Sequence, residues 1–171
     1  MKEKILELEK EQILKLSQKI IANTNIMAFF WEEACRSGEK VDPLELTLKI
    51  NRLFGDREAR GLINMGLVRS AGLDGIQQAL SYSHWAVMEE LRIERLNEST
   101  LRFGIVNCST KRAMDGIGRE LNCRKTGTEL RQSFIEVIDS RARVLPVTAP
   151  PDGINGIYSC LWEVNLVNDK K

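Results

Sequence analysis

The sequence predicts an α+β fold, in which an N-terminal helical layer precedes a mainly antiparallel four-stranded sheet. Helical periodicity of apolar residues extends to about residue 85, and a two-residue alternation begins after His84-Trp85. The elements predicted after that point follow the order β-β-α-α-β-β, which places a helical pair over the sheet. We therefore divide the chain into a helical region, 1–85, and an α/β region with a cysteine cluster, 86–171, which together form one compact unit.

The overall charge is balanced, because 25 Lys and Arg residues accompany 24 Asp and Glu residues in a chain of 171. This balance argues against broad binding to nucleic acid or to an anionic membrane surface. No apolar run approaches the roughly 20 residues that cross a bilayer, and the charged segment 1–5 is unlike a signal peptide. We expect a cytoplasmic protein without nucleic-acid or membrane partners, whose four cysteines are reduced.

Residues 2–22 have the spacing of an amphipathic helix, with Lys and Glu residues between the apolar positions. Asn23-Thr24-Asn25 interrupts the pattern and predicts the end of this helix. A second helix is expected from about residue 26 to Ser37-Gly38. The first helix either packs on its own core or serves as the arm of a homodimer.

Asp42-Pro43 is typical of a helix start, because Asp42 can cap the helix and proline fits its first position. Gly55 is predicted to end this helix, and Asp56 to cap the next one. The helices predicted in this part of the chain cover residues 43–54, 56–69 and 76–83.

Alternation of apolar and polar residues predicts the strands of the second half. Thr126 and Glu129 have the spacing of a capping box at the start of a helix. Pro146 lacks an amide donor, which predicts an edge strand. The predicted elements are a β-hairpin at 87–107, helices at 111–121 and 127–138, an extended stretch at 141–147 and a final strand at 157–167.

Cys108 ends the second hairpin strand, just before a predicted helix. If Ser109 or Thr110 caps that helix, its unpaired amides and dipole favour a thiolate at Cys108. Lys111 and Arg112 add positive charge, and the segment 109–112 can hold a carboxylate or phosphate. The alternative is an inert, half-buried cysteine.

Cys123 follows the predicted helix, and Cys160 lies in the last strand on the same face as Trp162. If the hairpin and the final strand share a sheet, Cys108, Cys123 and Cys160 converge. Three thiolates suit zinc or an iron–sulfur cluster, although no CxxC pair is present. A disulfide between Cys108 and Cys123 is a further alternative. The sequence identifies no cofactor.

His84 is the one histidine of the chain, so any Cys–His dyad must use it. It lies at the junction of the two regions, where pockets often form. A structural or surface histidine is the other interpretation of this position.

Several short motifs are distributed over the chain, namely Trp31-Glu32-Glu33, Arg57-Glu58-Ala59, Asn107-Cys108, Arg112, Gly116, the segment 120–123, Phe134, the segment 138–141, Ala149-Pro150-Pro151 and Cys160-Leu161-Trp162. Together they resemble a poorly characterised prokaryotic family related to the aminothiazoline-carboxylate hydrolase-like proteins. The similarity covers about residues 25–167 and is most specific in the cysteine pattern. It implies a helical N-terminal part, an α/β part built around the cysteines, and a hydrolase.

These observations predict a small-molecule-binding domain that is hydrolase-like and acts on a C–N or C–S bond through a cysteine-lined pocket. Cys108 is its candidate nucleophile, Glu120 its proton-handling group, and Arg112 its site for a substrate carboxylate. Cys123, Cys160 and Trp162 are further candidates for ligand contact. A metal or iron–sulfur sensor, using the three cysteines, and a structural, dimerising protein without catalysis are the alternatives.

Overall fold

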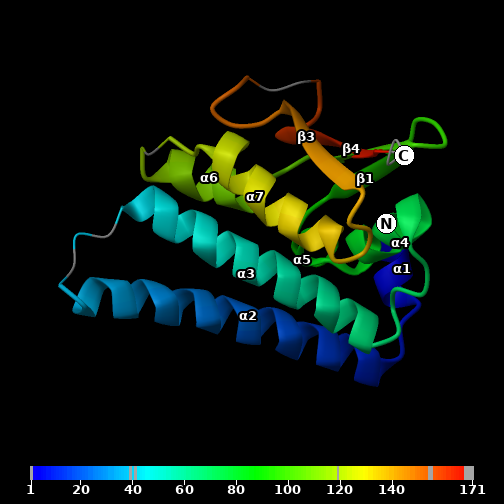
Figure 1. Ribbon diagram of the computed structural model, residues 1–171, viewed down its shortest axis with the longest axis horizontal. Helices are drawn as coiled ribbons and strands as arrows, with labels where there is room; N and C mark the ends of the chain where they lie inside the picture. The colour runs from blue at the N-terminus through cyan, green and yellow to red at the C-terminus, as the bar shows by residue number, and fades with distance from the viewer. Residues whose placement is uncertain (1, 39, 41, 119, 154–155, 168–171) are drawn as a thin grey trace.

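Helices and one antiparallel sheet form two layers in the computed structural model, which describes residues 2–38, 40, 42–118, 120–153 and 156–167 (Figure 1). This arrangement confirms the predicted α+β class. No helix of the described part is long and apolar enough to cross a membrane. The helices are α1 (Lys2–Leu6), α2 (Lys10–Arg36), α3 (Pro43–Asn64), α4 (Gly72–Tyr82), α5 (His84–Met88), α6 (Ser109–Gly116) and α7 (Cys123–Glu136), and the strands are β1 (Leu91–Arg95), β2 (Thr100–Ile105), β3 (Ala142–Thr148) and β4 (Cys160–Leu166).

The four strands lie in the order β1-β2-β4-β3, and every neighbouring pair is antiparallel. The hairpin β1–β2 forms as predicted, with Leu91 opposite Ile105. β4 then pairs with β2, which places Cys160 opposite Ile105. β3 lies at the edge of the sheet, as Pro146 predicts.

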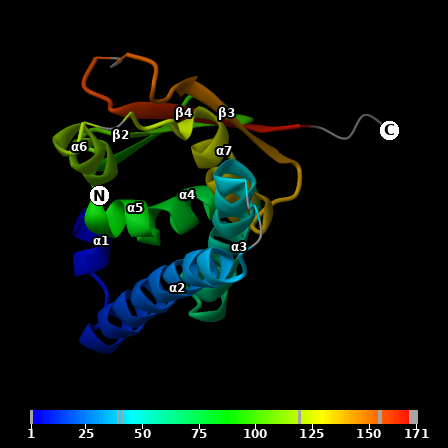
Figure 2. The same ribbon diagram turned by 90° about the vertical axis from the view of Figure 1, so that its left-hand side faces the viewer.

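One face of the sheet is buried beneath helices, as Figure 2 shows from the side. Phe103 of β2 and its partner Trp162 of β4 are both almost fully buried on this face. Trp85 of α5 and Phe134 of α7 pack over them, with the Trp85 ring centroid 5.4 Å from that of Phe134 and 6.5 Å from that of Phe103. Apolar burial on alternate strand positions therefore fixes which face the helices cover.

The predicted helix end at Asn23-Thr24-Asn25 is wrong, because α2 continues through these residues. The Thr24 hydroxyl donates to the carbonyl of Ile20 over 3.0 Å, so this polar side chain is satisfied within its own helix. The helical segment is interrupted earlier, between α1 and α2. At this point the Glu9 amide donates a hydrogen bond to Gln12 Oε1. Local polarity thus failed to mark the boundary.

The predicted helix end at Gly55 is also wrong, because α3 is continuous through it and includes the helix expected to start at Asp56. A Cβ atom on Gly55 would lie 2.5 Å from the carbonyl oxygen of Leu130 and 2.8 Å from the amide nitrogen of Phe134, both in α7. The glycine lets the two helix backbones approach closely. The predicted cap at Asp42 is confirmed, since Asp42 Oδ1 accepts from the Leu44 amide over 2.8 Å.

The predicted capping box at Thr126 and Glu129 is wrong, because α7 begins earlier, after Asn122. The Thr126 hydroxyl donates to the Asn122 carbonyl over 2.9 Å from inside the helix. Glu129 forms an ion pair with Arg52 of α3 instead, at 2.7 Å. The side chains proposed as a cap therefore face other partners.

Candidate functional site

A pocket of about 310 Å³ lies between the covered face of the sheet and the surrounding helices. α5 contributes His84 and Trp85, α7 contributes Cys123 and Arg131, and the turn after β2 contributes Cys108. The other lining residues include both apolar and polar side chains, and most of the surface they expose to the pocket is apolar. Its size and lining are within the range of small-molecule sites.

Two of the three C-terminal cysteines line this pocket, and the third lies close behind it. Cys108 and Cys123 line it, and the buried Cys160 lies behind it, with its Sγ 3.8 Å from Nη2 of Arg131. Each of these thiols is free, so the proposed disulfide between Cys108 and Cys123 is absent. The convergence follows from strand pairing, which sets Cys160 beside the end of β2.

Burial raises the pKa values of Cys108 and Cys123. Cys108 is itself the N-cap of α6, and its Sγ accepts from the Lys111 amide over 3.4 Å. Burial nevertheless raises the pKa of Cys108, against the direction that the helix N-terminus alone predicts. Burial also raises the pKa of Cys123 to about 11, although the positive charge of Arg131 opposes it. Both side chains are therefore neutral thiols near neutral pH.

Two of the candidate residues lie outside the pocket. Arg112 is exposed on α6, where its Nη1 donates to the Asn107 carbonyl over 3.2 Å. Glu120 follows the end of α6 and lines a separate surface hollow with Lys111 and Asp152. The structure therefore does not bring Arg112 or Glu120 together with Cys108.

A metal centre finds no support in the geometry. Within the described ranges, no three His, Cys, Asp or Glu side chains are grouped closely enough to hold a metal ion. Cys108 and Cys123 line one pocket and Cys160 lies behind it, but the three thiols do not form such a group. Trp162 is fully buried and contacts the pocket through Arg131 rather than by lining it.

Arg131 is the pocket residue that sequence reasoning missed. It is 4% exposed, and its guanidinium carbon lies 4.9 Å from the Trp85 ring centroid and 4.3 Å from that of Trp162. Nη1 donates to the Gly127 carbonyl over 3.1 Å, while Nε has no hydrogen-bond partner in the described part of the chain. The signal was its spacing, because Arg131 lies four residues after Gly127 and eight after Cys123, on one face of α7.

Two buried carboxylates complete the surroundings of the pocket. Glu58 of α3 accepts hydrogen bonds from the backbone nitrogen of His84 over 2.6 Å and pairs with its Nδ1 over 2.7 Å. Glu89 accepts from the Ser109 amide over 3.0 Å and from the hydroxyl of the same residue. Both carboxylates are thus engaged at the starts of helices, and neither forms an ion pair with Arg131.

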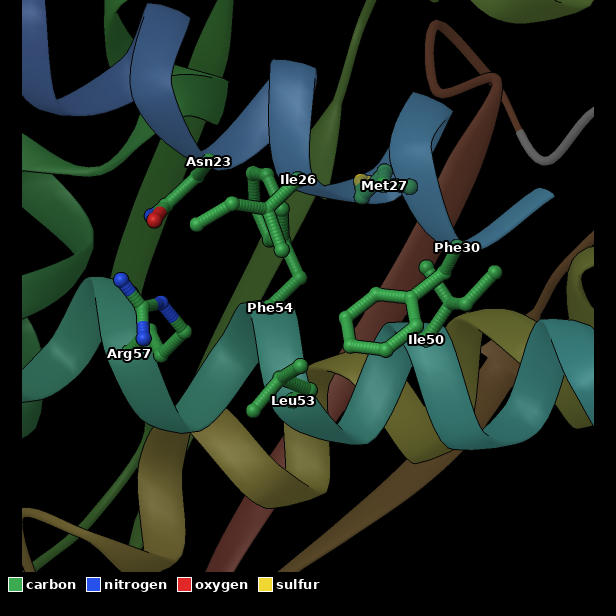
Figure 3. Close-up of a pocket in the computed structure, with 8 residues that line it drawn as sticks. All are labelled: Asn23, Ile26, Met27, Phe30, Ile50, Leu53, Phe54 and Arg57. Carbon is green, nitrogen blue, oxygen red and sulfur yellow. The ribbon is translucent and has the colours of Figure 1, made fainter. Parts of the chain in front are cut away.

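A second cavity, between α2 and α3, is far smaller, at about 10 Å³ (Figure 3). Asn23 and Arg57 point toward one another across it in Figure 3. Asn23 is 2% exposed, and neither amide atom has a hydrogen-bond partner among the residues described. The space is about that of one water molecule, so it is no site for an organic ligand.

Comparison with known proteins identifies a family but no function. Residues 6–166 match the model of a family of unknown function (DUF6125), so the chain belongs to this family. No curated protein and no solved structure matches it. The resemblance to an uncharacterised family is thereby supported, whereas a link to the aminothiazoline-carboxylate hydrolase-like proteins is not shown.

Proposed function

We propose that this member of the DUF6125 family is a small-molecule-binding domain, whose ligand is an organic anion held by Arg131 in the cysteine-lined pocket. The proposal rests on the burial of Arg131 and on the lack of an acidic partner for its charge in the described part of the chain. Arg131 is a buried guanidinium that lines a pocket and has no acidic partner among the described residues. Because no acidic side chain of the described residues pairs with this guanidinium, we infer that a bound ligand supplies the negative charge.

Burying an unpaired charge costs free energy, and an arginine does not escape this cost by losing its proton. Trp85 and Trp162 offset part of it through cation–π contact. A carboxylate would offset more, because it accepts charge-assisted hydrogen bonds from a guanidinium. Of the guanidinium nitrogens, Nε has no hydrogen-bond partner in the described residues.

The apolar lining indicates the rest of the ligand. Trp85, Ile105 and Leu130 supply apolar surface around the pocket. A flat, largely apolar body with one anionic group fits this combination of surfaces. Hydrolysis of a C–N or C–S bond stays a prediction, and Cys108 would serve it as a neutral thiol that has to be deprotonated first.

Benzoate and its uncharged counterpart benzamide test the proposal, with binding measured by calorimetry. We expect benzoate to bind at least tenfold more tightly than benzamide, because only benzoate pairs with Arg131. The preference should disappear in Arg131→Met. Equal affinities in the unmodified protein, or a preference that survives in Arg131→Met, would refute the proposal.

Two variants serve as matched controls. Arg112→Met removes an exposed arginine outside the pocket, and we expect benzoate affinity to stay within about twofold. Gly127→Ala keeps Arg131 but places a Cβ atom 2.9 Å from its Nη1 and 3.4 Å from the Trp162 ring. This variant should weaken benzoate binding while the charge remains.

Exposed apolar residues along α2 favour homodimerisation as a second candidate function. Leu14 is 56% exposed and Ile21 59%, and their spacing of seven residues places them on one side of the helix. Light scattering should then give a dimer mass, and a monomer mass for the double variant Leu14→Ser, Ile21→Ser. A monomer in the unmodified protein contradicts this candidate. The cytoplasmic location stays a prediction.

A further inference from the structure

One carboxylate holds His84 at two atoms. Oε1 of Glu58 accepts from the His84 backbone nitrogen over 2.6 Å, and Oε2 lies 2.7 Å from Nδ1 of the ring. The Glu58 side chain is 3% exposed. An ionised carboxylate only accepts hydrogen bonds, so in the neutral imidazole the proton is on Nδ1. Glu58 thereby sets both the orientation and the tautomer of the ring.

Two aromatic rings fix the imidazole further. Its centroid lies 5.1 Å from that of Phe54, with the rings nearly perpendicular, and 4.3 Å from that of Trp85. Nε2 has no hydrogen-bond partner among the described residues, and the side chain is 16% exposed. His84 lines the same pocket as Arg131, so a molecule bound there would lie beside the imidazole ring.

The other titratable groups around the pocket are not free proton acceptors. Burial raises the pKa of Cys108 and of Cys123, which keeps both thiols protonated. Glu89 accepts two hydrogen bonds from Ser109, and Arg131 is a permanent cation. Of the described groups that line the pocket, His84 is therefore the base best placed to take a proton from a ligand.

We propose that His84, oriented by Glu58, is the proton acceptor of this pocket, and that its ligands carry an N–H, O–H or S–H group besides the anion. The ligand class rests on the proposed function, whereas the state of His84 does not. The proton would pass from the ligand heteroatom to Nε2, leaving the electron pair on that atom. Glu58 would stabilise the resulting imidazolium.

The tautomer and the accessibility of Nε2 are tested without a ligand. The single histidine gives one pair of imidazole nitrogen signals, measured at about pH 8.5, where imidazole is ordinarily neutral. We expect Nδ1 to give the shift of a protonated nitrogen, and diethyl pyrocarbonate to acylate His84 at Nε2. A proton on Nε2, or an unreactive His84, would overturn the proposal.

Paired ligands test the acceptor role itself. We expect 3- or 4-hydroxybenzoate to bind about fivefold more tightly than the matching methoxybenzoate, as one added hydrogen bond predicts. The advantage should vanish in His84→Phe, which keeps a flat ring but has no atom that can accept the hydroxyl proton, and it should persist in Arg112→Met, which changes an exposed residue outside the pocket. An advantage absent for both isomers, or one that persists in His84→Phe, contradicts the proposal.

The failures of the two proposals are distinguishable. If benzoate does not bind, the proposed function fails, and the nitrogen signals still report on His84. If benzoate binds through Arg131 but the hydroxyl gives no advantage, only the acceptor role fails. In Glu58→Gln the fixed tautomer should be lost, and a ring that keeps its proton on Nδ1 alone would show that Glu58 does not determine it.

Discussion

The two sides of α3 differ in how closely they pack. On the side of α7, Gly55 allows backbone contact, with room for no additional methyl group. On the side of α2, a small cavity remains and the buried amide of Asn23 has no hydrogen-bond partner in the described residues (Figure 3). The comparison teaches that α3 and α7 form a rigid wall, which carries Glu58 and Arg131, whereas α2 is a more tolerant outer layer.

The largest expected effect on stability comes from Gly55→Ala, which disrupts the close contact between α3 and α7. The added Cβ meets the backbone of α7, so the helices must separate, at a cost of about 3 kcal/mol in the free energy of unfolding. Urea unfolding measures this loss. Gly116→Ala on α6 is the control, because nothing lies within 4 Å of its Cβ position, and it should not destabilise the protein. Equal effects of the two changes would contradict the tight contact.

A smaller effect is expected at the end of α7, where Asp139 extends the same wall. Its carboxylate accepts from Arg141 and from the Gly72 amide at the start of α4. The hydrogen bond from Arg141 is the main reason why the pKa of Asp139 is lowered from 3.8 to about 2. Because the folded pKa is depressed, this stabilisation is present above about pH 4 and is lost as the pH falls toward 2.

Asp139→Asn should therefore lower the free energy of unfolding by about 1 to 2 kcal/mol at neutral pH, after allowance for the half-exposed Arg141. The difference from the unmodified protein should shrink as the pH falls from about 4 to 2. Urea unfolding at several pH values measures it. A constant difference over this range would show that the charge of Asp139 is not its cause.

The smallest effect on stability is expected at the less closely packed interface between α2 and α3. Asn23→Leu replaces an unpaired buried amide with an apolar side chain of similar size, beside Ile26 and Phe54. We expect a gain of roughly 1 kcal/mol in the free energy of unfolding. Asn25→Leu, at an exposed position of the same helix, controls for helix propensity. Destabilisation by Asn23→Leu would show that this side is as closely packed as the other.

The fold class, the strand order in the chain and the edge position of β3 were predictable, because they follow from periodicity and from Pro146. The helix ends at Asn25 and Gly55 were not. Asn and Gly have low intrinsic helix propensity, but tertiary packing overrides this preference at both positions. In the sequence, a glycine that ends a helix cannot be told from one that allows two helices to pack closely.

The site was predictable only in part. Cys108, Cys123 and Cys160 were expected to converge; Cys108 and Cys123 line one pocket, and strand pairing places Cys160 behind it, opposite the end of β2. Arg131 was missed because one arginine on a polar helix resembles its neighbours until the fold buries it. Glu58 left a clearer signal, since it falls four residues from both Phe54 and Leu62 on an apolar stripe of α3.

The contact of two indoles with Arg131 gives the protein an intrinsic fluorescent probe of its pocket. Of its three tryptophans, two stack on this guanidinium, while Trp31 stands on the surface of α2. In a Trp31→Phe background, all tryptophan emission would come from Trp85, which lines the pocket, and from Trp162, which contacts Arg131 behind it. Ligand binding to the pocket could then be followed in real time by tryptophan fluorescence of the unlabelled protein, while libraries of candidate compounds are screened.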